Sequence, residues 1–165
     1  MIYYLFTLQL SGWEFLAFIL AYFLAVAFAF SAHEFSHAVV ANWCGDKTAK
    51  SLGRMSLNPF KHIDGFGLFS FLLVGFGWAK PVPVNPLHFR NYKKGIRLVS
   101  SSGVITNFVL GIIFSCLYFF ISPLLNLNNV FFEFVFFFLM IASTVNFSLA
   151  LFNILPIYPL DGFNF

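Results

Sequence analysis

Three long apolar runs alternate with polar segments along the chain. The first extends from about Trp13 to Trp43 and carries no charge between Phe15 and Ala32. The second covers Leu98–Ser122 and the third Val130–Leu155, and a proline directly follows each of these two. Each run is long enough to cross the hydrocarbon core of a bilayer as a helix. The pattern therefore predicts an all-α polytopic membrane protein with three long transmembrane helices.

Two shorter apolar segments do not fit this scheme. Gly65–Trp78 is too short to cross a membrane as a helix, and pairs of glycines bracket it. We interpret it as a short re-entrant hairpin or β-strand segment, with a short buried helix as the alternative. Met1–Ser11 fits either an edge strand at the membrane surface or the start of the first helix. Between the apolar runs, Lys80–Pro86 contains three prolines, which predict an extended path.

The composition supports an integral membrane protein. Of the 165 residues, 60% are hydrophobic and only 9% are charged, whereas about a quarter is usual in soluble domains. This length predicts one membrane-embedded domain over residues 1–165. The start of the chain lacks the basic residues and the cleavage site of a signal peptide, so we expect the first helix to stay in the protein.

The distribution of positive charge predicts the topology. All nine Lys and Arg residues lie between Lys47 and Arg97, beside the apolar runs. Such a block is typical of a cytoplasmic, headgroup-facing region and does not indicate a nucleic-acid partner. We therefore expect a multi-pass protein of the cell's inner (plasma) membrane. The first helix then ends inside the cell, the second leads out and the third returns. Glu14 and Glu133 lie at the outer ends in this arrangement.

The segment His33–His37 has the pattern HExxH inside the first apolar run. On a helix, positions i and i+4 share a face, so His33 and His37 can bind one zinc ion. Glu34 lies beside them as a candidate general base for a water molecule. Ionisable residues in such a helix are costly and therefore indicate a functional site. The alternative is a chance pattern in which both histidines are hydrogen-bonded within a core.

A catalytic zinc site usually has three protein ligands and an open fourth position. The candidates for the third ligand are Asp46, His62, Asp64, His88 and Asp161. Asp161 is favoured because it follows two prolines that end the third helix and precedes a glycine, although it also fits a plain turn. His62 and His88 fit surface or supporting roles. The site is then expected within the membrane, near its cytoplasmic side.

Three other functions are consistent with parts of the pattern. A membrane metal transporter or channel would need more ionisable residues along a path. A non-catalytic zinc-binding membrane module would have no need of Glu34. An external domain held by a disulfide is not favoured, because Cys44 and Cys116 are expected at opposite ends of their helices.

Four segments of the chain resemble the site-2 protease family of intramembrane zinc metalloproteases. They are His33–Asp46, Asn58–Gly65, Gly77–Pro86 and Asn153–Gly162. The resemblance implies a zinc endopeptidase that hydrolyses peptide bonds in or near transmembrane segments of other membrane proteins, as in regulated intramembrane proteolysis. It also implies one zinc ion per chain.

The same resemblance assigns roles to two residues near the end of the chain. It implies that Asp161 is the third zinc ligand and that Asn153 helps to stabilise the oxyanion. Asn107 is a weaker candidate for the oxyanion role. For Asn107 and Asn146 we favour hydrogen bonds between helices. The segment Gly65–Trp78 could receive a substrate as an added strand.

The chain departs from that family in two places. Val104 stands where a proline often follows the glycine at this point, which affects local packing more than chemistry. The chain also stops four residues after Asp161, which predicts a shortened C-terminus. Without an inserted peptide-binding (PDZ) domain, it is similar to a minimal form of the family.

Overall fold

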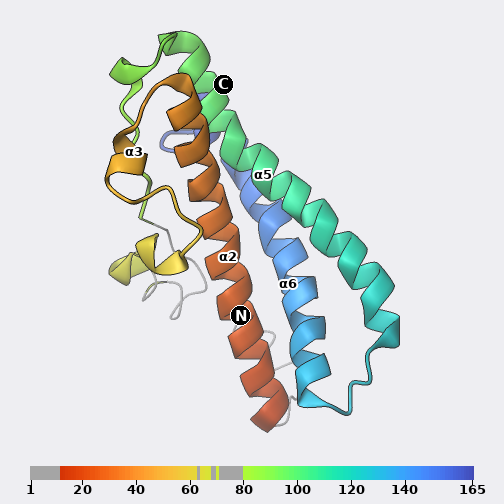
Figure 1. Cartoon of the computed structure of the whole chain (residues 1–165). Coiled ribbons are helices and arrows are strands. Elements are labelled where there is room, and N and C mark those ends of the chain that lie inside the picture. Colours follow the sequence, from red (N-terminus) through yellow and green to blue (C-terminus); the bar gives the residue numbers. More distant parts are fainter. Residues whose placement is uncertain (1–11, 63, 68–69, 71–79) are drawn as a thin grey trace.

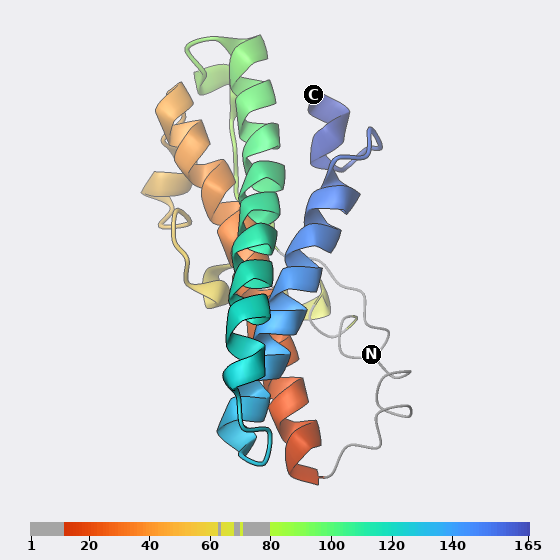
Figure 2. The ribbon, with the colours of Figure 1, turned by 90° about the vertical axis from the view of Figure 1, so that its right-hand side faces the viewer.

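The computed structural model describes residues 12–62, 64–67, 70 and 80–165, and three long helices dominate it (Figure 1). These are α2 (Gly12–Cys44), α5 (Tyr92–Ile121) and α6 (Val130–Asn153). Helix α5 runs antiparallel to α2 and α6, and each of the three packs along both others (Figures 1 and 2). All three are long and apolar enough to cross a membrane, which confirms this part of the predicted fold.

The helix boundaries differ from the predicted ones mainly at the start of α5. This helix begins at Tyr92, not near Leu98, because the side chain of Asn91 caps it by accepting a hydrogen bond from Lys94 N (3.0 Å). Several basic residues therefore lie in its first turns and not in a loop. Helix α2 ends where predicted, since Gly45 follows it with a φ of +117°.

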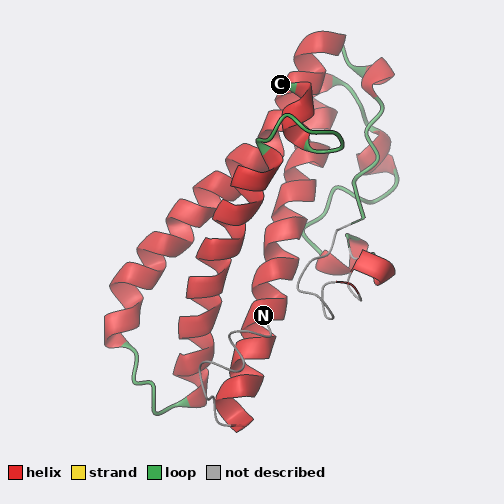
Figure 3. Ribbon diagram, turned by 180° about the vertical axis from the view of Figure 1, so that it is seen from behind, coloured by secondary structure: helices red, strands yellow, loops and turns green. Residues whose placement is uncertain are grey.

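Short helices connect the long ones. They are α3 (Thr48–Ser51), η1 (Pro59–Lys61), η2 (Pro86–His88), η3 (Ser122–Leu124) and η4 (Asp161–Asn164). The first three lie in the connection from α2 to α5, part of which follows the side of α2 (Figure 1). The part of the chain that the structure describes contains no β-strand (Figure 3).

The predicted re-entrant segment Gly65–Trp78 lies largely outside the described residues. Within it, residues 65–67 and 70 are described, and they are helical. Residues on either side of this segment are joined, because Lys80 N donates to the carbonyl of His62 (2.7 Å). A re-entrant hairpin or strand therefore stays a prediction. The segment Met1–Ser11 also lies outside the described residues.

Small side chains allow the long helices to approach one another closely. Along α2, the residues Ala17, Ala21, Ala25 and Ala29 repeat every fourth position, and all are buried. A Cβ atom on Gly103 of α5 would lie 2.5 Å from the ring of His33. Small residues at contacts between membrane helices favour this close packing. They bring α5 directly against the HExxH face of α2.

Candidate metal centre

Three side chains from the two ends of the chain meet at one point. His33 and His37 lie one turn apart on α2, and their Nε2 atoms are 3.0 Å apart. The Oδ2 atom of Asp161, at the start of η4, lies 3.1 Å from Nε2 of His33 and 3.3 Å from Nε2 of His37. Among the described residues, these three form the group that could hold a metal ion.

The outer nitrogen of each imidazole is hydrogen-bonded away from this point. Nδ1 of His37 lies 2.8 Å from the carbonyl oxygen of Val99, which can only accept, so this nitrogen carries the hydrogen. Nδ1 of His33 lies 2.9 Å from Oδ1 of Asn107. In the neutral imidazoles, the two Nε2 atoms therefore present lone pairs toward each other and toward the Asp161 carboxylate.

These residues fit a zinc ion. Two ligand atoms about 2.0–2.1 Å from one zinc ion at the tetrahedral angle lie about 3.3–3.4 Å apart, close to the separations seen here. Oδ2 of Asp161 is buried and has no hydrogen-bond partner among the described residues. Three electron-pair donors at such short range repel one another unless a cation lies between them. Two imidazoles and one carboxylate are also an established donor set for catalytic zinc.

Asp161 reaches this position because the chain reverses after α6. Leu160 N donates to the carbonyl of Ile157 (2.8 Å), and η4 follows and packs against α5. A side chain on Gly162 would overlap the carbonyl group of Ile154, so glycine permits the close return. This return places the Asp161 carboxyl beside the imidazoles of His33 and His37.

Glu34, the predicted general base, is held by a main-chain group. Its Oε2 atom accepts a hydrogen bond (2.7 Å) from the main-chain nitrogen of Val82. Val82 belongs to the extended segment 80–85, which is part of the connection from α2 to α5. Arg54 fixes the same segment by donating from Nη2 to the carbonyl of Lys80 (2.9 Å) and, at 3.2 Å, to that of Pro81. This extended segment thus sets the orientation of a carboxylate next to the metal ligands.

The other four candidates for the third ligand lie elsewhere in the described structure. Nε2 of His62 contacts the carbonyl of Ser56 at 2.7 Å, and Asp64 accepts from Gly67 N at 2.8 Å. Asp46 and His88 bind each other, as described below.

The two asparagines that were considered for the oxyanion role have different surroundings. The side chain of Asn153 donates to the carbonyl of Leu149 in its own helix (3.0 Å), and no contact tests its predicted role. Asn107 makes the predicted contact between helices, because its Nδ2 lies 3.1 Å from Oδ1 of Asn146. Its second contact, with His33, had no signal in the sequence, since the two residues are 74 positions apart.

Asp46 organises the connection between α2 and α5. Its buried carboxylate accepts hydrogen bonds from Asn85 N (2.7 Å), from the Thr48 main chain (3.0 Å) and hydroxyl, and from Nδ1 of His88 (3.1 Å). Burial raises the pKa of Asp46, but these hydrogen bonds outweigh it and lower the pKa below its usual value. The carboxylate thus ties the end of α2 to the segment that holds Glu34.

We expect Asp46→Asn to lower the stability of the protein by roughly 1–3 kcal/mol at pH 7, the cost of mispairing a buried acceptor. Since the folded pKa is lowered, the carboxylate contributes stability above its unfolded pKa of about 3.9 and loses it as pH falls through the folded value. Melting of the detergent-solubilised proteins at pH 7 and pH 3 measures this. The difference in melting temperature between wild type and variant should be smaller at pH 3 than at pH 7. An equal difference at both pH values would contradict a stabilising role of the ionised Asp46 carboxylate.

One comparison with known proteins bears on this site. A protein of Bacillus subtilis (strain 168) named "Putative zinc metalloprotease YwhC" is 41% identical to this chain over 140 residues. The aligned part covers 82% of this chain but 62% of the length of that relative. No protein-family model matches the chain, and no solved structure matches it. The chain is thus similar, over most of its own length, to a protein whose name describes a zinc metalloprotease.

Proposed function

We propose that this protein is an intramembrane zinc metalloprotease that resembles the site-2 proteases. The observation that carries the proposal is the convergence of His33, His37 and Asp161 at separations that fit zinc, in a chain with three helices that could span a membrane. The similarity to a protein named as a zinc metalloprotease supports the same chemistry. Its substrates would be other membrane proteins, and it would hydrolyse peptide bonds in or near their transmembrane segments, as in regulated intramembrane proteolysis.

Different residues of the site would bind the metal and transfer the proton. His33, His37 and Asp161 would hold the metal, and zinc, when bound, supplies a Lewis acid that polarises the scissile carbonyl and acidifies a water molecule. Glu34 takes a proton from the attacking water and returns it to the leaving amine. Val82 N, which donates to Glu34, keeps one carboxylate oxygen oriented and leaves the other for this transfer.

The proposal includes two further roles that were predicted from the sequence. Asn153 would offer an amide donor to the oxyanion after its bond to Leu149 is exchanged for one to the substrate. The segment Gly65–Trp78 would receive the unwound substrate as an added strand through main-chain hydrogen bonds.

The two alternative functions are less well supported. A metal transporter needs ligands at several depths along a path, whereas the described residues offer one group of three. A non-catalytic zinc-binding module would not need a carboxylate at Glu34 that is held in place by a main-chain donor.

For the orientation, we propose that the region Lys47–Arg97 is cytoplasmic, because it contains every Lys and Arg of the chain. A cysteine introduced at Lys93, in a background without Cys44 and Cys116, should react with a membrane-impermeant thiol reagent only after the cells are opened. Labelling of this cysteine from outside intact cells would contradict the orientation.

The proposed activity is tested with the purified chain in lipid vesicles that also contain a panel of labelled transmembrane peptides. Removal of metal with a chelator should stop peptide cleavage, and an equimolar amount of zinc should restore it. A peptide whose transmembrane part is replaced by a soluble sequence serves as the control substrate and should be cleaved poorly. Cleavage that continues without metal, or no cleavage of any membrane-embedded peptide by the zinc-loaded protein, would overturn the proposal.

A further inference from the structure

A chain of hydrogen bonds leads away from the metal site through all three long helices. It starts at Nδ1 of His33 on α2, which lies 2.9 Å from Oδ1 of Asn107 on α5. Nδ2 of Asn107 donates to Oδ1 of Asn146 on α6 (3.1 Å), and Nδ2 of Asn146 donates to the carbonyl of Ala142 (2.8 Å). Both asparagines are fully buried.

The last acceptor in this series of hydrogen bonds, the carbonyl of Ala142, determines which group donates and which accepts in each of them. The carbonyl of Ala142 can only accept, so the nitrogen of Asn146 faces it and the oxygen of Asn146 faces Asn107. Asn107 must then point its nitrogen at Asn146 and its oxygen at His33. Nδ1 of His33 consequently carries the hydrogen, and its Nε2 keeps a lone pair for a metal. A longer contact of 3.5 Å from Asn107 Nδ2 to the carbonyl of Ala29 favours the same orientation more weakly.

We propose that Asn146 is a positioning residue for the metal ligand His33, acting through Asn107, so that α6 controls the tautomer and the metal affinity of a ligand on α2. The inference rests on the proposed metal site. It adds a role to a residue whose hydrogen bonds go to Asn107 and Ala142 and not to a metal ligand. It also links the two halves of the site, because α6 leads directly into the turn that carries Asp161.

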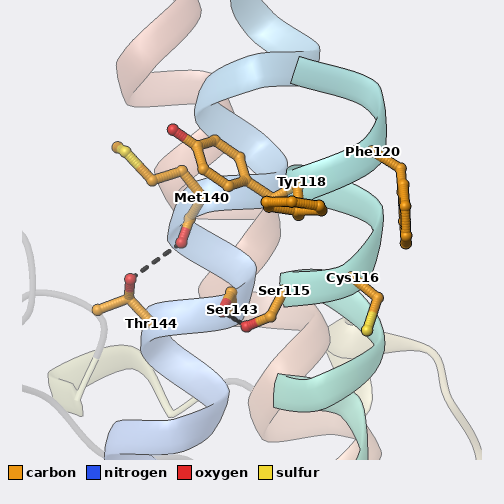
Figure 4. A pocket seen from close by; sticks show the side chains of 8 residues that line it. Ser115, Cys116, Tyr118, Phe120, Met140, Ser143 and Thr144 are labelled. Carbon is orange, nitrogen blue, oxygen red and sulfur yellow. Dashed lines mark hydrogen bonds between the residues drawn. The ribbon is translucent and has the colours of Figure 1, made fainter. Parts of the chain in front are cut away.

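The structure provides a matched control for this role. The hydroxyl groups of Ser115 and Ser143 form a second polar contact between α5 and α6 (2.6 Å), in the wall of a pocket between these helices (Figure 4). Ser143 lies three residues before Asn146 on the same helix but has no hydrogen bond toward His33. Asn146→Leu and Ser143→Ala each remove one polar contact between α5 and α6, and Asn146→Leu alone breaks the path to the metal ligand.

The first measurement is the affinity of the detergent-solubilised protein for Zn²⁺ and Co²⁺, by competition with a chromophoric chelator. Asn107→Leu should weaken binding about 10- to 100-fold, as expected for a direct partner of a metal-bound histidine. Asn146→Leu should weaken it about three- to tenfold, since Asn107 keeps its contact with Ala29. The visible spectrum of bound Co²⁺ should change in both variants. Ser143→Ala should bind metal as the wild type does.

The second measurement needs no metal. In protein with ¹⁵N-labelled histidine, the NMR signals of His33 should show the Nδ1–H tautomer, and Asn146→Leu should convert it to a mixture. If the wild type bound no metal, the proposed function would fail, while this tautomer shift would still test the inference. If Asn146→Leu does not fold, Asn146→Ser serves instead, because its hydroxyl can bond to Ala142 but is too short to reach Asn107. An unchanged tautomer, or equal metal affinities for the Asn146 and Ser143 variants, would overturn the inference.

Discussion

Glu34→Gln is expected to abolish peptide hydrolysis and leave the zinc content unchanged. The amide cannot take up a proton at neutral pH, and loss of a general base typically costs a factor of about 10²–10⁴ in rate. The glutamine oxygen can still accept the hydrogen bond from Val82 N, so the local structure should persist. The measurement is the initial rate of cleavage of a membrane-embedded peptide by wild type and variant with equal bound zinc.

The matched control for this prediction is Glu14→Gln. It makes the same change of side chain in the first turn of α2, more than four helical turns away from His33. The control should cleave at the wild-type rate. A Glu34→Gln protein that keeps more than about a tenth of the activity would show that another group takes the proton from water.

Asp161→Ala is expected to lower zinc occupancy, to abolish cleavage and to remove the stabilisation of the fold by zinc. His33 and His37 come from one helix, so a metal bound by them alone would not link α2 to the end of α6. With all three ligands, zinc at about 100 times its dissociation constant should stabilise the wild type by about 2.7 kcal/mol. Thermal unfolding in detergent, with zinc and with a chelator, measures this increment, which should vanish in the variant.

The chelator-treated proteins provide an internal comparison. Without metal, the Asp161 carboxylate lies against two imidazole lone pairs, so its removal should cost little stability. His88→Ala removes an aspartate–histidine contact of similar length at Asp46, outside the metal site, and should keep the zinc increment. If Asp161→Ala retained wild-type zinc affinity, Asp161 would not be the third ligand.

The long helices could be predicted from the sequence because a bilayer imposes a minimum length on each apolar run. The same argument misplaced the start of α5. It assumed that the basic residues before Leu98 lie in a loop, whereas Asn91 caps a helix that begins among them. Charge limits where a helix can lie in the membrane, but it does not prevent the helix from continuing beyond it.

The candidate metal site was predictable to the extent that its chemistry is local. His33 and His37 are separated by one helical turn, Asp161 was favoured by its position after the last helix, and the three side chains lie together in the structure. The contacts that orient these groups were not predictable. Asn107 meets His33 and Val82 meets Glu34 only after helices and connection have packed, and no spacing in the sequence encodes those distances.

X-ray absorption at the zinc edge of the purified, zinc-loaded protein tests the assignment of the site most directly. Two imidazoles and one carboxylate oxygen should surround the metal at about 2.0–2.2 Å, with one further light atom, and Asp161→Ala should lose one oxygen neighbour or the metal itself. A sulfur neighbour at about 2.3 Å, or an identical spectrum for the Asp161 variant, would contradict zinc binding by His33, His37 and Asp161.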